Sequence, residues 1–86
     1  MAEQQIGTIT HYFGKIGVAA IGITDGELRV GDTIHVVGHT SDFTQVVESL
    51  QLDNQAAEIA KPGQTVGVKV PEHARRHDKV FVVRQD

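Results

Sequence analysis

Gln64-Thr65-Val66-Gly67-Val68-Lys69-Val70 carries the clearest strand pattern in the chain. Apolar and polar residues alternate along it, so that Val66, Val68 and Val70 share one face of an extended chain. A period of two is typical of a β-strand with one buried face. Pro62-Gly63 precedes the stretch and fits a type II turn, because Pro presets the first φ angle and Gly supplies a positive φ at the second position. The sequence therefore predicts a strand over residues 64–70 that follows a tight turn.

Short β-branched runs recur on both sides of this strand, separated by Gly, Pro, Asn and Asp, and no stretch shows a sustained helical period. Such spacing is typical of an all-β sandwich or barrel. Gly26, Gly31 and Asp32 mark two more turns, since Gly takes the positive φ that tight turns require. The pattern predicts a polar loop over 71–78 and further strands over 6–13, 15–23, 33–38, 43–52, 57–60 and 79–83.

So small a set of strands has to protect its edges from pairing with other chains, and closing into a barrel does this directly. We therefore expect an all-β fold, a small closed antiparallel β-barrel of about six to seven strands. The 86 residues suffice for one domain, so residues 1–86 are predicted to form a single unit. Residues 1–5 are polar and are expected to be a disordered tail.

The composition excludes several classes of protein. The chain has no cysteine, which excludes disulfides and Cys-ligated zinc. Its N-terminus lacks the apolar core of a signal peptide, and no apolar run approaches the ~20 residues of a membrane span, so we expect a cytoplasmic protein without membrane contact. The formal net charge of −3 counts against a dedicated duplex-binding protein, because phosphate contacts usually require a basic excess.

Three motifs resemble the second, β-barrel domain of translation elongation factors. They are DGELRVGDTI at residues 25–34, AKPGQTVGV at 60–68 and DKVFVV at 78–83, and they follow one another in that family's order. Residues 39–45 are also similar to small stand-alone relatives described only as elongation-factor-like. The third motif departs from the family, since His77 stands where Gly is usual, and we expect its bend to differ.

The resemblance implies a β-barrel with a binding role in translation, through contacts with RNA or the ribosome. The GTPase domain of that family is missing, because the chain has no Gly-x-x-x-x-Gly-Lys-Ser/Thr motif and Gly14-Lys15 is followed by Ile16. We therefore expect a non-catalytic binding module without nucleotide or other cofactor. The alternative is a protein–protein interaction or homo-oligomerisation domain with no nucleic-acid role.

The histidines and hydroxyl residues do not predict a metal site or a catalytic site. His35 and His39 are four residues apart. On a strand this spacing covers roughly 13 Å, too far for two imidazoles to share an ion held at about 2 Å. Ser41 and Asp42 lie beside His39 but are more typical of a turn than of a catalytic triad. We expect no metal and no enzymatic activity.

Basic residues near the C-terminus are the first candidate site. Their stretch contains only two acids, Glu72 and Asp78. It could contact RNA backbone or an acidic protein surface, and the alternative is ordinary solvated surface. The candidates are Lys69, Arg75, Arg76, Lys79 and Arg84.

Apolar residues on both faces of residues 15–23 are the second candidate site. Ile16 and Val18 point one way, and Ile21 and Ile23 point the other. Only one face of a strand fills a small barrel, so apolar residues on both predict a partner or an exposed patch, unless loops cover them. We assign this surface to Ile21 and Ile23, with a homodimer or another protein as partner. Phe43 would anchor a binding surface if exposed and would be a core residue if buried.

Overall fold

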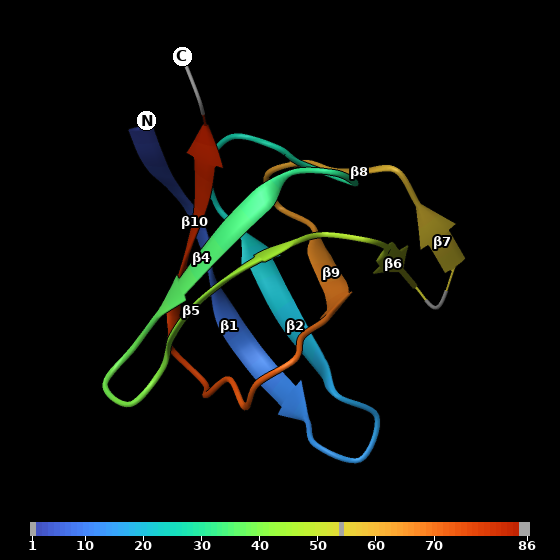
Figure 1. The fold of residues 1–86 in the computed structure, drawn as a ribbon. Helices are drawn as coiled ribbons and strands as arrows, with labels where there is room; N and C mark the ends of the chain where they lie inside the picture. Colours follow the sequence, from blue (N-terminus) through green and yellow to red (C-terminus); the bar gives the residue numbers. More distant parts are fainter. Residues whose placement is uncertain (1, 54, 85–86) are drawn as a thin grey trace.

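The computed structural model describes residues 2–53 and 55–84, and in this part of the chain it contains ten β-strands and no helix (Figure 1). Eight strands form one sheet in the order β5-β4-β10-β1-β2-β9-β6-β7, and β3 pairs with β8. Every pairing is antiparallel, so the predicted all-β fold is confirmed. The strands are β1 (Ala2–Phe13), β2 (Val18–Ile23), β3 (Leu28–Arg29), β4 (Thr33–Val37), β5 (Asp42–Val46), β6 (Leu50–Leu52), β7 (Gln55–Ala57), β8 (Ile59–Ala60), β9 (Thr65–Lys69) and β10 (Lys79–Arg84).

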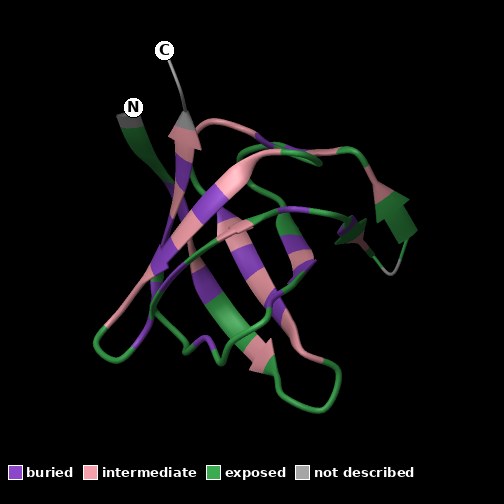
Figure 2. Ribbon diagram, in the orientation of Figure 1, coloured by how far each residue is buried: buried purple, intermediate pink, exposed green. Residues whose placement is uncertain are grey.

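The core lies on the concave side of the curled sheet. Figure 2 shows buried and less buried residues alternating along β2, β4 and β9, as a period of two requires. The strand predicted over 64–70 is present, and Val66, Val68 and Val70 are buried as expected. Val and Ile dominate the core, because β-branched side chains pack well on a pleated surface.

The sheet curls without closing, which corrects the predicted closed barrel. Its β5 and β6 come from one predicted strand, residues 43–52, which bends at 47–49 so that β5 pairs with β4 while β6 pairs with β9. Among the described residues, β5 pairs with no second strand. Across this seam the Gln45 side-chain Nε2 donates instead to the Lys69 backbone oxygen at 2.8 Å. Pro71 follows on the far side and lacks the N–H that a continued backbone ladder would need.

The same bend changes which residues of this segment are buried. An unbroken strand would place Val46, Leu50 and Leu52 on one face. In the structure Val46 is 56% exposed, while Val47 is fully buried. The Val47 N–H donates to the Asp32 backbone oxygen at 2.8 Å, which anchors Val47 to the turn before β4.

Residues 2–5 belong to β1 instead of forming the expected disordered tail. They pair with β10, from Ala2 opposite Arg84 to Gln5 opposite Phe81. The backbone ladder holds this segment although the side chains of residues 3–5 are exposed, which composition alone does not reveal. Met1 lies outside the described residues.

Ile21 and Ile23 point into the core, which overturns their assignment to a partner surface. Ile21 lies opposite Ile9 on β1 and Val66 on β9, and all three are buried. Side chains of directly opposed residues lie on the same face of a sheet, so these neighbours fix Ile21 on the inner face. Ile23 follows two residues later on that face and is 2% exposed. The outer face of β2 therefore carries Val18 and Ala20 instead.

One turn is repeated at the starts of three strands. In each copy the first residue donates its backbone N–H to the side-chain oxygen of the fourth, and the fourth donates its own N–H back to the first residue's carbonyl. The third residue has positive φ, which is 96° at Gly31, 90° at Gly63 and 76° at His77. The bend at His77 thus matches the other two, although we expected it to differ. The copies are Arg29–Asp32, Lys61–Gln64 and Arg75–Asp78.

Candidate protein-binding surface

A shallow apolar hollow lies on the outer face of β2, β9 and β6. We call it the outer-face hollow and define it by Phe13, Ile16, Val18, Ala20, Gln51 and Gly67. Its volume is about 320 Å³. Ile16 is 63% exposed and Phe13 46%, and both are large apolar side chains that folding leaves in contact with water. Exposed apolar residues that cluster around a hollow are typical of an interaction site.

Small residues and a tight turn create this hollow. Gly67 has no side chain, and a Cβ there would lie 3.4 Å from Cγ1 of Val18, so the hollow's floor would fill. The β1–β2 turn holds Ile16 outward, because the backbone oxygen of Phe13 accepts the N–H of Gly17 at 2.9 Å and that of Ile16 at 3.3 Å. The Phe13 ring packs against the His11 ring with centroids 4.4 Å apart and ring planes tilted by 59°. The aromatic rim is therefore supported from one side.

Polar and charged side chains border the outer-face hollow. Asp53 and Thr65 also line it, and Lys15 lies in the β1–β2 turn between Phe13 and Ile16. A basic residue thus stands on the β2 side and an acidic residue on the β6 side. The surface is an apolar centre with opposite charges at its edges, which is the arrangement of many protein interfaces.

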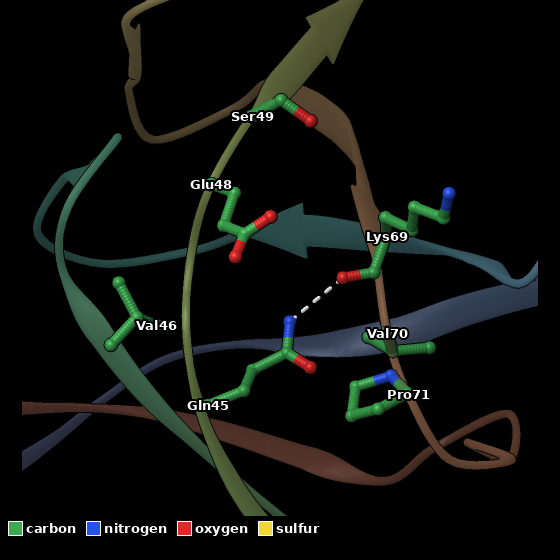
Figure 3. A pocket seen from close by; sticks show the side chains of 7 residues that line it. All are labelled: Gln45, Val46, Glu48, Ser49, Lys69, Val70 and Pro71. Atoms are coloured by element: carbon green, nitrogen blue, oxygen red, sulfur yellow. Dashed lines mark hydrogen bonds between the residues drawn. The ribbon is translucent and has the colours of Figure 1, made fainter.

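A second hollow of about 360 Å³ lies at the seam between β5 and the end of β9 (Figure 3). We call it the seam hollow and define it by Gln45, Glu48, Ser49, Lys69, Val70 and Pro71. The Oε1 atom of Gln45 is buried and has no hydrogen-bond partner among the described residues. In Figure 3 the Glu48 carboxylate points from the β5 side into the space, whereas the Lys69 ammonium points away from it.

A charged cluster on the opposite part of the sheet joins three strands. Nδ1 of His35 on β4 lies 3.1 Å from a carboxylate oxygen of Glu3 on β1, and Nε2 lies 2.5 Å from Oδ1 of Asp42 on β5. Both partners are carboxylates, which only accept when ionised, so the imidazole satisfies both only when both nitrogens carry hydrogen. The hydrogen bond to Asp42, and next that to Glu3, raises the pKa of His35 above its ordinary value of 6.5.

The raised pKa predicts that stability falls as pH increases. Protonated His35 stabilises the fold fully below the unfolded pKa of 6.5, and this contribution is lost as pH rises through the higher folded pKa. The carboxylates are largely exposed, so each pair contributes about 0.5 kcal/mol and the total is about 1 kcal/mol. Urea unfolding at about pH 6 and about pH 8.5 should show this loss, and His35→Gln should remove it. His39→Gln in the β4–β5 turn should keep the wild-type dependence, and an equal loss in His35→Gln would contradict the assignment.

The basic candidates from the sequence do not all meet at one place. Lys79 begins β10 and Arg84 ends it, so these two lie at opposite ends of one strand. Arg76 donates its Nε to the backbone oxygen of Thr10 at 3.1 Å, and the backbone N–H of Arg75 donates to Asp78. Lys69 ends β9 beside the seam hollow. The side chain of Arg84 lies outside the described part.

Sequence reasoning missed the residues that carry the outer-face hollow. Phe43, the other candidate anchor, is 7% exposed and belongs to the core. Phe13, Ile16 and Gly67 come from three separate segments, and only the pairing of β1, β2 and β9 brings them together. The sequence did contain one signal. Its alternation puts Ile16 and Val18 on one face of residues 15–23 and Ile21 and Ile23 on the other. Once the inner face of β2 is known, the outer face follows.

Among residues 2–53 and 55–84, no group of three or more His, Cys, Asp or Glu side chains has the arrangement of a metal site. The described segments also include no helix of the length and apolarity that crossing a membrane requires.

Comparison with known proteins relates the chain to part of several proteases. No protein-family model matches it. It is 35% identical over 82 residues to an uncharacterized protease of Methanocaldococcus jannaschii, a match that covers 94% of the chain and 20% of the protease. It is 36% identical over 77 residues to a collagenase of Porphyromonas gingivalis, covering 88% of the chain and 21% of the collagenase. The chain thus spans about a fifth of the length of these curated relatives.

Solved structures share the fold. The C-terminal domain of a Geobacillus thermoleovorans protein assigned to the U32 peptidases superposes with a TM-score of 0.85 at 23% identity, covering 92% of this chain and 91% of that one. Its selenomethionine variant gives a TM-score of 0.84 at 24% identity. These similarities show the same fold, over nearly the whole of both chains.

The comparisons overturn the resemblance to elongation factors and the translation role that it implied, and they show no role in RNA binding. The chain is instead similar in sequence to about a fifth of a protease and of a collagenase, and it shares the fold of the C-terminal domain of a protein assigned to the U32 peptidases. The physical reason lies in the motifs, because all three coincide with the repeated turn at the starts of β4, β9 and β10. Such a turn leads the chain into a strand by local hydrogen bonds, so unrelated all-β domains can share it.

Proposed function

We propose that this chain is a non-catalytic accessory domain of a U32-type peptidase, and that it binds polypeptide through the outer-face hollow. The observation that carries the proposal is the pair of exposed apolar side chains, Ile16 and Phe13, at a hollow that the fold leaves open. The relatives support the setting, since they are named as proteases or a collagenase and most of their length lies outside the match. A protease acts on polypeptide chains, and a separate domain can hold such a chain near the site of cleavage.

The size and chemistry of the hollow suit one apolar side chain of an extended polypeptide. Burying a Val, Leu, Ile or Phe side chain contributes about 1.5–3 kcal/mol. Ordering the peptide offsets part of this, so a single hollow gives weak and reversible binding. Reversible binding suits a domain that holds a substrate and releases it after cleavage.

Fluorescence anisotropy with labelled, unfolded casein tests the proposal. The wild-type chain should bind it, and Ile16→Ser should weaken binding about tenfold or more, because the apolar contact of Ile16 is lost. Val30→Ser is the matched control, since Val30 is 43% exposed but lies away from the hollow. Equal binding by wild type and Ile16→Ser would contradict binding through the outer-face hollow. Hydrolysis of the casein by the purified chain would contradict the non-catalytic role.

A second candidate is self-association through the same surface, and the charges at its edges favour it. In a two-fold symmetric dimer each contact occurs twice, so Lys15 of one copy could face Asp53 of the other. Sedimentation equilibrium distinguishes the two functions. A stable dimer that Lys15→Glu disrupts would support self-association, whereas a monomer that binds casein supports the accessory domain.

A further inference from the structure

The seam hollow has the chemistry of a site for a basic side chain, and it lies next to the outer-face hollow along β9. We propose that it takes a Lys or Arg side chain of the same polypeptide that the outer-face hollow holds; the inference rests on the proposed function. The outer-face hollow borders residues 65–67 of β9, and the seam hollow borders residues 69–71. On β6 and the segment before it, the order is the same, with Gln51 in the first and Ser49 in the second.

The side-chain amide of Gln45 forms part of the wall of the seam hollow. Nε2 of Gln45 donates to the backbone oxygen of Lys69 at 2.8 Å, and this bond fixes the orientation of the side-chain amide. With the amide reversed, two acceptors would face each other, so Oε1 has to stay on the other side. There it is buried without a partner among the described residues. Because this oxygen is buried, a ligand in the hollow does not reach it, and a bound side chain would use the exposed carboxylate of Glu48 instead.

The charges at the seam favour a cation over an anion. Glu48 is exposed, points into the space in Figure 3, and forms no ion pair within the described part of the chain. The nearest basic side chain, Lys69, directs its ammonium away from the hollow in the same view. Val70 and Pro71 supply apolar surface for the aliphatic stem of a Lys or Arg. The charged end of that side chain would then reach the carboxylate of Glu48 through a charge-assisted hydrogen bond.

The spacing of the two hollows sets the spacing of the residues that they take. Gly67 beside one hollow and Lys69 beside the other are two residues apart on the same face of β9, a span of about 7 Å in a strand. An extended polypeptide beside β9 advances at the same rate. It would therefore place a basic residue two positions from the apolar residue, with both side chains on the side that faces the hollows.

Peptides with both ends blocked test this inference. The reference peptide is Lys-Ser-Leu-Ser-Lys, which offers a basic residue two positions from Leu in either orientation. Its two Lys are replaced by Gln or by Glu in the comparison peptides. The wild-type chain should bind the Lys peptide about three- to tenfold more tightly than the Gln peptide and should bind the Glu peptide most weakly.

Two variants of the chain test whether the preference for the Lys peptide comes from the seam hollow. Glu48→Gln should make the Lys and Gln peptides equal, and Glu48→Lys should reverse the order in favour of the Glu peptide. Glu58→Lys changes the net charge by the same amount but lies in neither hollow, so it should keep the wild-type order.

The outcomes separate this inference from the proposed function. Equal binding of the Lys and Gln peptides by the wild-type chain overturns the basic-residue site, and so do equal effects of Glu48→Lys and Glu58→Lys. The proposed function survives either result if replacing the central Leu by Ser still abolishes binding. If none of the three peptides binds and casein does not bind either, the proposed function itself fails.

Discussion

Gly7→Ala is expected to unfold the chain or to lower its melting temperature by more than about 15 °C. Gly7 lies in β1 where this strand pairs with both β10 and β2. A Cβ at this position would come within 2.0 Å of the backbone oxygen of Gly22 and 2.9 Å of its carbonyl carbon. Both are backbone atoms of a central strand, so the contact can be relieved only by separating β1 from β2. The cost of about 3–5 kcal/mol would remove most of the stability of a domain of this size.

Circular dichroism during heating and urea unfolding measure this effect. Gly14→Ala is the matched control, because its Cβ would meet only Cε2 of Tyr12 at 3.5 Å, an ordinary contact. It should melt within about 3 °C of the wild type, and can gain stability because the unfolded chain loses freedom. A Gly7→Ala variant that melts as high as the control would show that β1 and β2 do not approach so closely.

Ile21→Ala is expected to destabilise the chain by about 2–5 kcal/mol, whereas Ile16→Ala should cost less than about 0.5 kcal/mol. Ile21 is fully buried between Ile9 and Val66, so shortening its side chain leaves a cavity that its neighbours cannot fill. Ile16 is 63% exposed, so its removal exposes no core. The difference corresponds to about 10–30 °C in melting temperature for a domain of this size.

The pair also tests which face of β2 is buried. Both substitutions remove the same three carbon atoms, so only the surroundings of each residue distinguish them. Equal destabilisation, or a larger effect of Ile16→Ala, would mean that the outer-face hollow belongs to the core and cannot receive a polypeptide.

Local patterning predicted most of the strands and their polarity. Residues 64–70 form β9 as expected, and residues 33–38 and 79–83 correspond to β4 and β10. Each begins at a turn with positive φ, and residues 64–70 also alternate regularly between apolar and polar, so these signals are local in sequence. The prediction of one unbroken strand over residues 43–52 was wrong. The bend within this segment depends on the hydrogen bond between Val47 and Asp32, which are distant in sequence.

Long-range pairing explains the other errors. Nothing in residues 15–23 says which of two apolar faces is buried, since that depends on partners in β1 and β9. β1 also shifts its register between Gln5 and Gly7 and again between Ile9 and His11, which reverses the face that each part presents. As a result Ile9 is buried while His11 and Phe13 are exposed. The candidate site combines such segments, so the sequence could not delimit it.

The seam between β5 and the end of β9 is held by a side chain, so we expect its local stability to be lower than that of the paired strands. Strands elsewhere in the sheet are held by ladders of several backbone bonds, but β5 is fastened to the end of β9 by the amide of Gln45. Rotation of that amide would break this hydrogen bond and leave the backbone ladders of the sheet intact. We therefore expect β5 and the end of β9 to separate there before any other part of the sheet opens.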